Sequence, residues 1–196
     1  LTQECSRMGI EVLKPNILSS NKKFEVNSES KIEYGLGAIK GVADSFIKHL
    51  CQERETIKFK DLWDFSKKVD IRLGGKKSLE ALSQSGAFDS LAPSRTIAIE
   101  CTKDMLNDGK NLNGNSNFQS GDLFANMQEC FNPYEKYKNL QDLSLSEKLE
   151  LEKKSLGYYL SGHPVLAIED KIKKISSHKI NQLNNDIKKS SLVCLI

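Results

Sequence analysis

The sequence predicts a mainly α-helical fold, and two observations carry that prediction. Apolar residues with helical spacing recur through residues 34–106, separated by glycine-containing turns only a few residues long. After a long Asn- and Gly-rich stretch, the capping sequence Ser144-Leu-Ser-Glu147 opens a further helix. No apolar run approaches the 18 or so residues that a membrane span requires. We therefore expect a cluster of short helices around its own core.

The first half of the chain divides into two parts. Residues 1–33 look irregular or β-rich, with turn signals at Pro15, Asn16 and Ser19-Ser-Asn21. Asp44 or Ser45 is expected to cap the first helix that follows. The predicted helices are Ala43–Glu53, Phe59–Val69, Lys76–Ser83 and Ser94–Leu106.

The second half begins with a loss of pattern between residues 107 and 133. The stretch Asn107–Asn117 is rich in Asn and Gly and predicts a flexible linker, because it holds too few apolar residues to bury. The helix opened by Ser144 should run to about Leu160, where Gly162 and Pro164 stop it.

The end of the chain predicts one more helix and a strand. A charged helix is expected near Ala167–Ile175, followed by Ser- and Asn-rich turns. The final apolar run, Ser191–Ile196, resembles a strand cut off midway.

Charge and cysteine content narrow the class of protein only slightly. The formal net charge is +3, and its excess lies in residues 1–95, with 16 Lys and Arg against 13 Asp and Glu. The five cysteines are isolated and form no CxxC pair, which argues against a disulfide framework or a zinc site and favours a reducing cytoplasm.

A glycine-rich turn stands before the first predicted helix, within Tyr34–His49. Helix N-termini attract phosphate, and glycine lets a ligand approach the backbone closely. This pattern predicts a helix-hairpin-helix motif, a DNA-binding hairpin in which Ile39-Lys-Gly-Val42 offers amides to a backbone phosphate. Two alternatives remain, a purely structural turn and a dinucleotide site, although the spacing GxGxxxG fits the second poorly. The residues expected to contact DNA are Gly37, Ile39, Lys40, Gly41 and Val42.

A second hairpin candidate contains Ser85-Gly-Ala-Phe88, where Gly86 also suits an ordinary helix C-cap. The basic run before it has one acid, Asp70, and by itself is typical of a solvated face. Beside two hairpins the run becomes a candidate phosphate-contacting surface. Its members are Lys67, Lys68, Arg72, Lys76 and Lys77.

The Asn-rich stretch also carries a short apolar peptide, Gln119-Ser-Gly-Asp-Leu-Phe124. Leu123 and Phe124 have no local core to join and would suit a groove on a protein partner, with Gln119 as a polar contact and Asp122 beside the anchors. The alternative is that both fold back onto the helical cluster.

No catalytic constellation is visible in the chain. No two acids have a spacing suited to two-metal chemistry, and the three histidines are isolated. The position of His163, next to Pro164 at a predicted helix stop, predicts a structural role for this histidine.

In this order the motifs resemble the family of bacterial DNA polymerase III alpha subunits, the C-family replicative polymerases. YGLGAIKGV at Tyr34–Val42 is close to a signature of that family, although Ala43 stands where glycine is frequent and Lys14 where a second proline is frequent. The other matching segments are Cys5–Asn16, Phe59–Phe65, Ser85–Leu91, Gln119–Phe124, Glu152–Pro164 and Leu192–Ile196.

The resemblance implies the division of the chain. It assigns the end of a fingers domain to residues 1–33, a tandem helix-hairpin-helix domain to 34–106, and a linker with a clamp-binding motif to 107–135. Connecting helices would occupy residues 136–182, and the truncated start of an OB-fold domain 183–196.

The resemblance also implies function. The parent protein would be a DNA-directed DNA polymerase, a nucleotidyltransferase using Mg²⁺, with its catalytic aspartates in a palm domain outside this chain. This chain would hold no catalytic residue, metal or cofactor. It would bind duplex DNA and other subunits of the polymerase III holoenzyme, and it would bind the beta sliding clamp through Gln119, Asp122, Leu123 and Phe124. Its location would be the cytoplasm and not a membrane. The alternatives are a stand-alone helix-hairpin-helix module of a repair protein and a piece of a dinucleotide enzyme.

Overall fold

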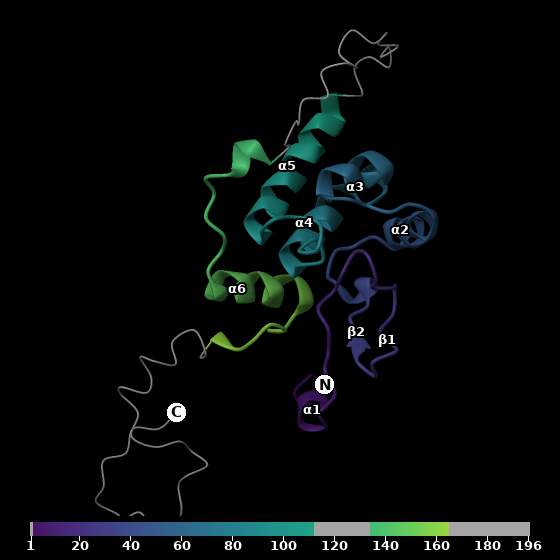
Figure 1. Ribbon diagram of the computed structural model, residues 1–196, viewed down its shortest axis with the longest axis vertical. Coiled ribbons are helices and arrows are strands. Elements are labelled where there is room, and N and C mark those ends of the chain that lie inside the picture. The colour runs from purple at the N-terminus through teal and green to yellow at the C-terminus, as the bar shows by residue number, and fades with distance from the viewer. Residues whose placement is uncertain (1, 112–133, 165–196) are drawn as a thin grey trace, which may run out of the picture. The chain divides into compact units, whose positions relative to one another are not determined.

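The computed structural model describes residues 2–111 and 134–164 and is mainly helical there, as predicted (Figure 1). Two short antiparallel strands, β1 (Glu25–Val26) and β2 (Ile32–Glu33), pair with Glu25 opposite Glu33. The helices are α1 (Thr2–Arg7), α2 (Asp44–Thr56), α3 (Leu62–Lys68), α4 (Gly75–Ser85), α5 (Arg95–Asn111) and α6 (Leu145–Leu156), with 3-10 turns η1 (Leu36–Ala38), η2 (Ile71–Leu73) and η4 (Glu135–Tyr137).

Helix α4 is the centre of the packing. It contacts α5 and α6, and Figure 1 shows it between them and α2. Aromatic rings from three segments meet in the core, with centroids 5.1 Å apart for Phe59 and Phe65 and 5.4 Å for Phe65 and Phe88. Burying such rings is a main source of stability for a domain of this size.

One compact unit extends from Leu1 to Leu160, and a second covers Ser161–Ile196. The sequence-based boundaries at residues 34, 107 and 136 therefore fall inside the first unit. Helix α6 belongs to this unit because Leu149 and Leu156 on its inner face are buried.

The four helices predicted within residues 34–106 are confirmed, but the cap expected for the first, Asp44 or Ser45, is wrong. The N-cap of α2 is Ala43, which offers no side-chain cap, and Asp44 is already helical. The Asp44 carboxylate lies 2.6 Å from Lys22 Nζ. The Ala43 amide donates to Ser78 Oγ on α4 at 3.0 Å, so a neighbouring helix satisfies one backbone amide at the start of α2.

Three further helix bounds differ from the prediction by three residues or more. Helix α2 continues to Thr56 and not only to Glu53, α3 begins at Leu62 and not at Phe59, and α5 continues to Asn111 and not only to Leu106. In addition, α1 forms in a part that was expected to be irregular or β-rich. In α1, Arg7 and Glu4 form an i,i+3 ion pair, which supports a short helix locally.

Helix α6 confirms the capping box and corrects the helix end. Ser144 Oγ accepts from the Glu147 amide, while the Glu147 carboxylate accepts from the Ser144 amide. The helix ends at Leu156, because Gly157 takes the left-handed conformation (φ 93°) that glycine adopts without strain. Gly162 and Pro164 are therefore not what stops it. The helix predicted near Ala167–Ile175, the strand within Ser191–Ile196 and the OB-type start at residues 183–196 lie outside the described residues, as does most of the predicted linker.

Candidate DNA-binding hairpin

The first hairpin is a tight turn between η1 and α2, comprising residues 39–43. The Val42 amide donates to the Ile39 carbonyl at 3.3 Å, and Gly41 has φ +95°, a conformation that favours glycine. Ser78 of α4 closes the turn from below, because its Oγ accepts from the Ala43 amide and donates to the Gly41 carbonyl at 3.3 Å. The hairpin is thus held by a buried hydroxyl of a neighbouring helix.

The hairpin side chains divide into buried and exposed members. Ile39 is 2% exposed and Val42 packs against the core, so these two side chains anchor the turn. Lys40 and Gly41 are exposed. Any ligand of the hairpin therefore meets the Lys40 ammonium and the backbone around Gly41.

Lys77 of α4 lies against the same turn. A Cβ built on Gly41 would be 3.0 Å from Lys77 Cε and 3.2 Å from Lys77 Cγ, so the lysine stem runs past the glycine. Neither Lys40 nor Lys77 forms an ion pair with an acid of the described residues. The structure therefore brings two lysines that form no ion pair with a described acid to one exposed turn, which opens a 13-residue helix.

Three other members of the basic run have acids of their own. Lys68 lies 2.8 Å from Asp64, Arg72 bonds to Asp70 at 2.8 Å, and Lys76 lies 3.6 Å from Glu80. The hydrogen bond from Lys68 lowers the pKa of Asp64, and that from Arg72 lowers the pKa of Asp70. Because each of these cations lies on an acid of its own, it attracts a phosphate less strongly than an unpaired cation would. Lys67 is exposed at the end of α3.

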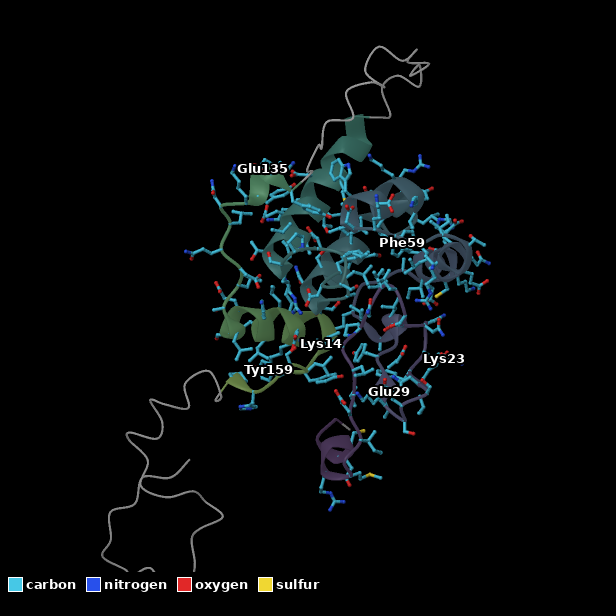
Figure 2. All side chains as sticks on the ribbon, in the orientation of Figure 1. Lys14, Lys23, Glu29, Phe59, Glu135 and Tyr159 are labelled. Carbon is cyan, nitrogen blue, oxygen red and sulfur yellow. The ribbon has the colours of Figure 1, made fainter. Side chains whose placement is uncertain are left out.

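Gly35 and Gly37 serve a contact inside the protein. A Cβ at Gly35 would lie 2.6 Å from the Lys23 carbonyl carbon, and one at Gly37 would lie 2.8 Å from the Lys22 oxygen. The Gly37 amide also donates to the Lys22 carbonyl at 2.9 Å. Lys23, which Figure 2 labels, belongs to the loop that these glycines admit. Because that loop occupies the space, the glycine pattern is explained without a dinucleotide.

The second hairpin candidate is buried. Gly86 has φ +83° and caps α4, with the Gly86 amide donating to Ser83 at 3.2 Å and the Ala87 amide to Leu82 at 3.0 Å. The C-cap interpretation is therefore confirmed. The Arg95 guanidinium covers Gly86, which leaves the turn no exposed amide surface like that of the first hairpin.

The two flanks of the Asn-rich stretch belong to the same unit. The Leu62 amide donates to the Tyr134 hydroxyl at 3.1 Å, and Lys136 Nζ lies 2.5 Å from Asp104 of α5. The Tyr137 hydroxyl also bonds to Asp104. Burial raises the pKa of Tyr134 to about 12. The peptide Gln119–Phe124 itself lies outside the described residues.

A contact that sequence reasoning missed joins the hairpin to α6. The Lys40 amide donates to the Ser155 carbonyl at 2.9 Å, and a Cβ at Gly157 would lie 3.1 Å from Lys40 Nζ. The residue pattern of neither segment predicts this contact, because the two partners lie far apart along the chain.

Residues 2–111 and 134–164 contain no group of three His, Cys, Asp or Glu side chains able to hold a metal ion. In the same ranges no helix has the length and apolarity to cross a membrane. His49, one of the isolated histidines, accepts from the Asp70 amide at 3.3 Å.

Comparison with known proteins shows what the chain is similar to. The family described as "Helix-hairpin-helix motif" matches residues 9–98. Proteins named DNA polymerase III subunit alpha match 93% of the chain, at 30% identity in Pseudomonas fluorescens, 33% in Vibrio cholerae and 34% in Haemophilus influenzae. This chain is similar to one segment of the DNA polymerase III alpha subunit. It spans 17%, 16% and 16% of these three relatives, about a sixth of their length. The resemblance carried by the sequence motifs is confirmed.

Proposed function

We propose that this chain binds duplex DNA without base selectivity, as a segment of a DNA polymerase III alpha subunit, through the hairpin of residues 39–43. The observation that carries the proposal is the meeting of Lys40, Gly41 and Lys77 at one exposed turn. Two unpaired ammonium groups flank a glycine whose backbone a phosphate can approach closely. The amides of the first turn of α2 add partial positive charge at the same place.

The chemistry of this hairpin favours affinity over sequence readout. Lysine ammonium groups and backbone amides recognise phosphate oxygens, which are the same for every base pair. With two lysines engaged, the slope of log K against log salt concentration should be about −2 from these contacts. Such a hairpin would suit a polymerase, which must hold duplexes of any sequence.

The test is fluorescence anisotropy of a labelled DNA duplex over a salt series. Gly41→Glu places a carboxylate beside Lys77 and should weaken binding at least tenfold at low salt. Gly9→Glu is the matched control, because Gly9 also has positive φ (+73°) but has no atom within 4 Å of an added Cβ. Equal affinity for the two variants would exclude the hairpin as the contact.

We further propose that Gln119, Asp122, Leu123 and Phe124 bind the beta sliding clamp. Support comes from the sequence pattern and from the two flanks of this stretch, both of which are anchored on one unit. Two weak attachments to one DNA substrate raise apparent affinity by about 10²–10⁴ when geometry permits both, and processivity would follow.

Clamp retention in a pull-down tests this second proposal. Leu123→Ala with Phe124→Ala should abolish retention and leave DNA binding unchanged. Leu140→Ala with Leu145→Ala is the control, since these side chains are 43% and 46% exposed elsewhere in the chain. Clamp retention by the first double variant would refute the assignment.

DNA-directed DNA synthesis, contacts with other holoenzyme subunits and a cytoplasmic location are proposed for the longer protein. Mg²⁺ would serve that activity through aspartates of a palm domain. The described residues do not fit such a metal site, so none of this chemistry is assigned to them. Finding no paired palm aspartates in the coding sequence that flanks this chain would overturn the polymerase proposal.

A further inference from the structure

We propose that the terminal turn of α6, residues 155–157, positions the Lys40 side chain for phosphate contact. This inference rests on the proposed DNA-binding role of the hairpin. It assigns a positioning role to residues 155–157. These residues lie far along the chain from the hairpin of residues 39–43 and are not part of the hairpin motif.

The first contact is between main chains. The Lys40 amide donates to the Ser155 carbonyl at 2.9 Å, whereas the Ile39 and Val42 amides bond within residues 36–42. Ser155 is buried, and its Oγ donates to the Leu151 carbonyl at 2.8 Å. The backbone of Lys40 is therefore tied to a helix that is not part of the hairpin.

The second contact concerns the Lys40 side chain. A Cβ at Gly157 would lie 3.1 Å from Lys40 Nζ and 3.4 Å from Lys40 Cε, so the ammonium rests over the glycine that ends α6. The carbonyl end of a helix favours a nearby cation. Gly157 thus leaves room for Lys40 at a place where the helix dipole holds the ammonium.

The terminal turn is itself fixed to the rest of the unit. On α6, Glu152 Oε1 lies 3.4 Å from Arg95 Nη1 of α5, and both side chains are almost fully buried. Glu152 Oε2 accepts from the Leu160 amide at 3.1 Å. Since α6 also contacts α4, which carries Lys77, the frame that holds Lys40 is the frame that holds Lys77. A lysine held in place before binding loses less conformational freedom on meeting a phosphate.

A double-mutant cycle between Gly157 and Lys40 tests the inference on the full chain, with duplex affinity at 0.1 M salt as the readout. Lys40→Ala should lower affinity about fivefold to tenfold, as expected for one lost phosphate contact. Gly157→Ala should lower it about threefold or more, and the double variant should bind no more weakly than Lys40→Ala. Gly9→Ala, a left-handed glycine with open surroundings, should leave affinity unchanged.

Two safeguards separate positioning from loss of folding. Circular dichroism melting sets a temperature at which every variant is folded. Gly157→Asn provides a second variant, because Asn tolerates the left-handed conformation while its Cβ still meets Lys40. A positioning role predicts that it too weakens binding only when Lys40 is present.

The outcomes are distinct. Additive effects of the Gly157 and Lys40 substitutions, or full affinity in both Gly157 variants, would overturn the positioning role while leaving the hairpin as the DNA contact. Full affinity in Lys40→Ala would overturn the proposed use of Lys40 itself, and the inference with it.

Discussion

Arg95 is the position where one substitution should most damage the unit. Its side chain is 2% exposed, and its guanidinium lies 2.5 Å from Asp89 and 3.4 Å from Glu152. Glu152 is 1% exposed, whereas Asp89 is 38% exposed. Arg95→Met keeps the apolar stem but leaves the Glu152 carboxylate buried without its cation.

The expected magnitudes follow from these exposures. Removing one partner of a buried ion pair costs about 3–5 kcal/mol, so Arg95→Met should lower the free energy of unfolding by that amount. Asp89→Asn should cost about 1 kcal/mol or less, because water screens a partly exposed pair. Glu152→Gln should fall between the two, since an amide still accepts a hydrogen bond from Arg95.

Urea unfolding followed by circular dichroism measures this order. With an m-value of about 2 kcal/mol/M, Arg95→Met should lower the unfolding midpoint by about 1.5–2.5 M. Asp89→Asn should move it by about 0.5 M or less. If Asp89→Asn cost as much as Arg95→Met, the reasoning from burial would be refuted.

Two further predictions concern titrating groups. Burial raises the pKa of the Cys101 thiol to about 11, so at pH 8 only on the order of one thiol in a thousand is ionised. Iodoacetamide should therefore label the partly exposed Cys51 well before Cys101 in site-resolved mass spectrometry. Equal labelling rates would contradict the burial of Cys101. Hydrogen bonds from Lys136 and then Tyr137 lower the pKa of Asp104, so the stability gained from that carboxylate is present at neutral pH and is lost as pH falls through the lowered pKa. The melting temperature of Asp104→Asn should therefore lie below that of the parent at pH 7 and approach it below about pH 4, whereas a gap independent of pH would contradict the ion pair.

Local signals in the sequence were sufficient for most helices and for two of their ends. The Ser144–Glu147 capping box and the Gly86 C-cap each depend on residues a few positions apart, and both formed as predicted. Gly157 carried a similar local signal, a glycine directly after the helical pattern, but Gly162 and Pro164 were given the role instead. The motif order along the chain was sufficient to predict the similarity to a segment of DNA polymerase III alpha subunits.

The hairpin shows what local signals leave open. Five basic residues read alike in the sequence, yet only the fold shows that Lys68 and Arg72 lie on their own acids while Lys77 reaches Gly41. The sequence predicted that Gly37 contacts phosphate. Only the fold shows that Gly37 leaves room for the backbone of Lys22, since an added Cβ would lie 2.8 Å from the Lys22 oxygen.

Helical periodicity, caps and motif order are properties of neighbouring residues, so the sequence by itself determined the helical class, most helix positions and the similarity to a polymerase segment. The contacts of Lys40 with Ser155 and Gly157, and the hydrogen bond from the Ala43 amide to Ser78, were decided by the tertiary structure alone. Such contacts join segments far apart along the chain. They form only when the packing of α4, α5 and α6 brings those segments together, and no local pattern records them.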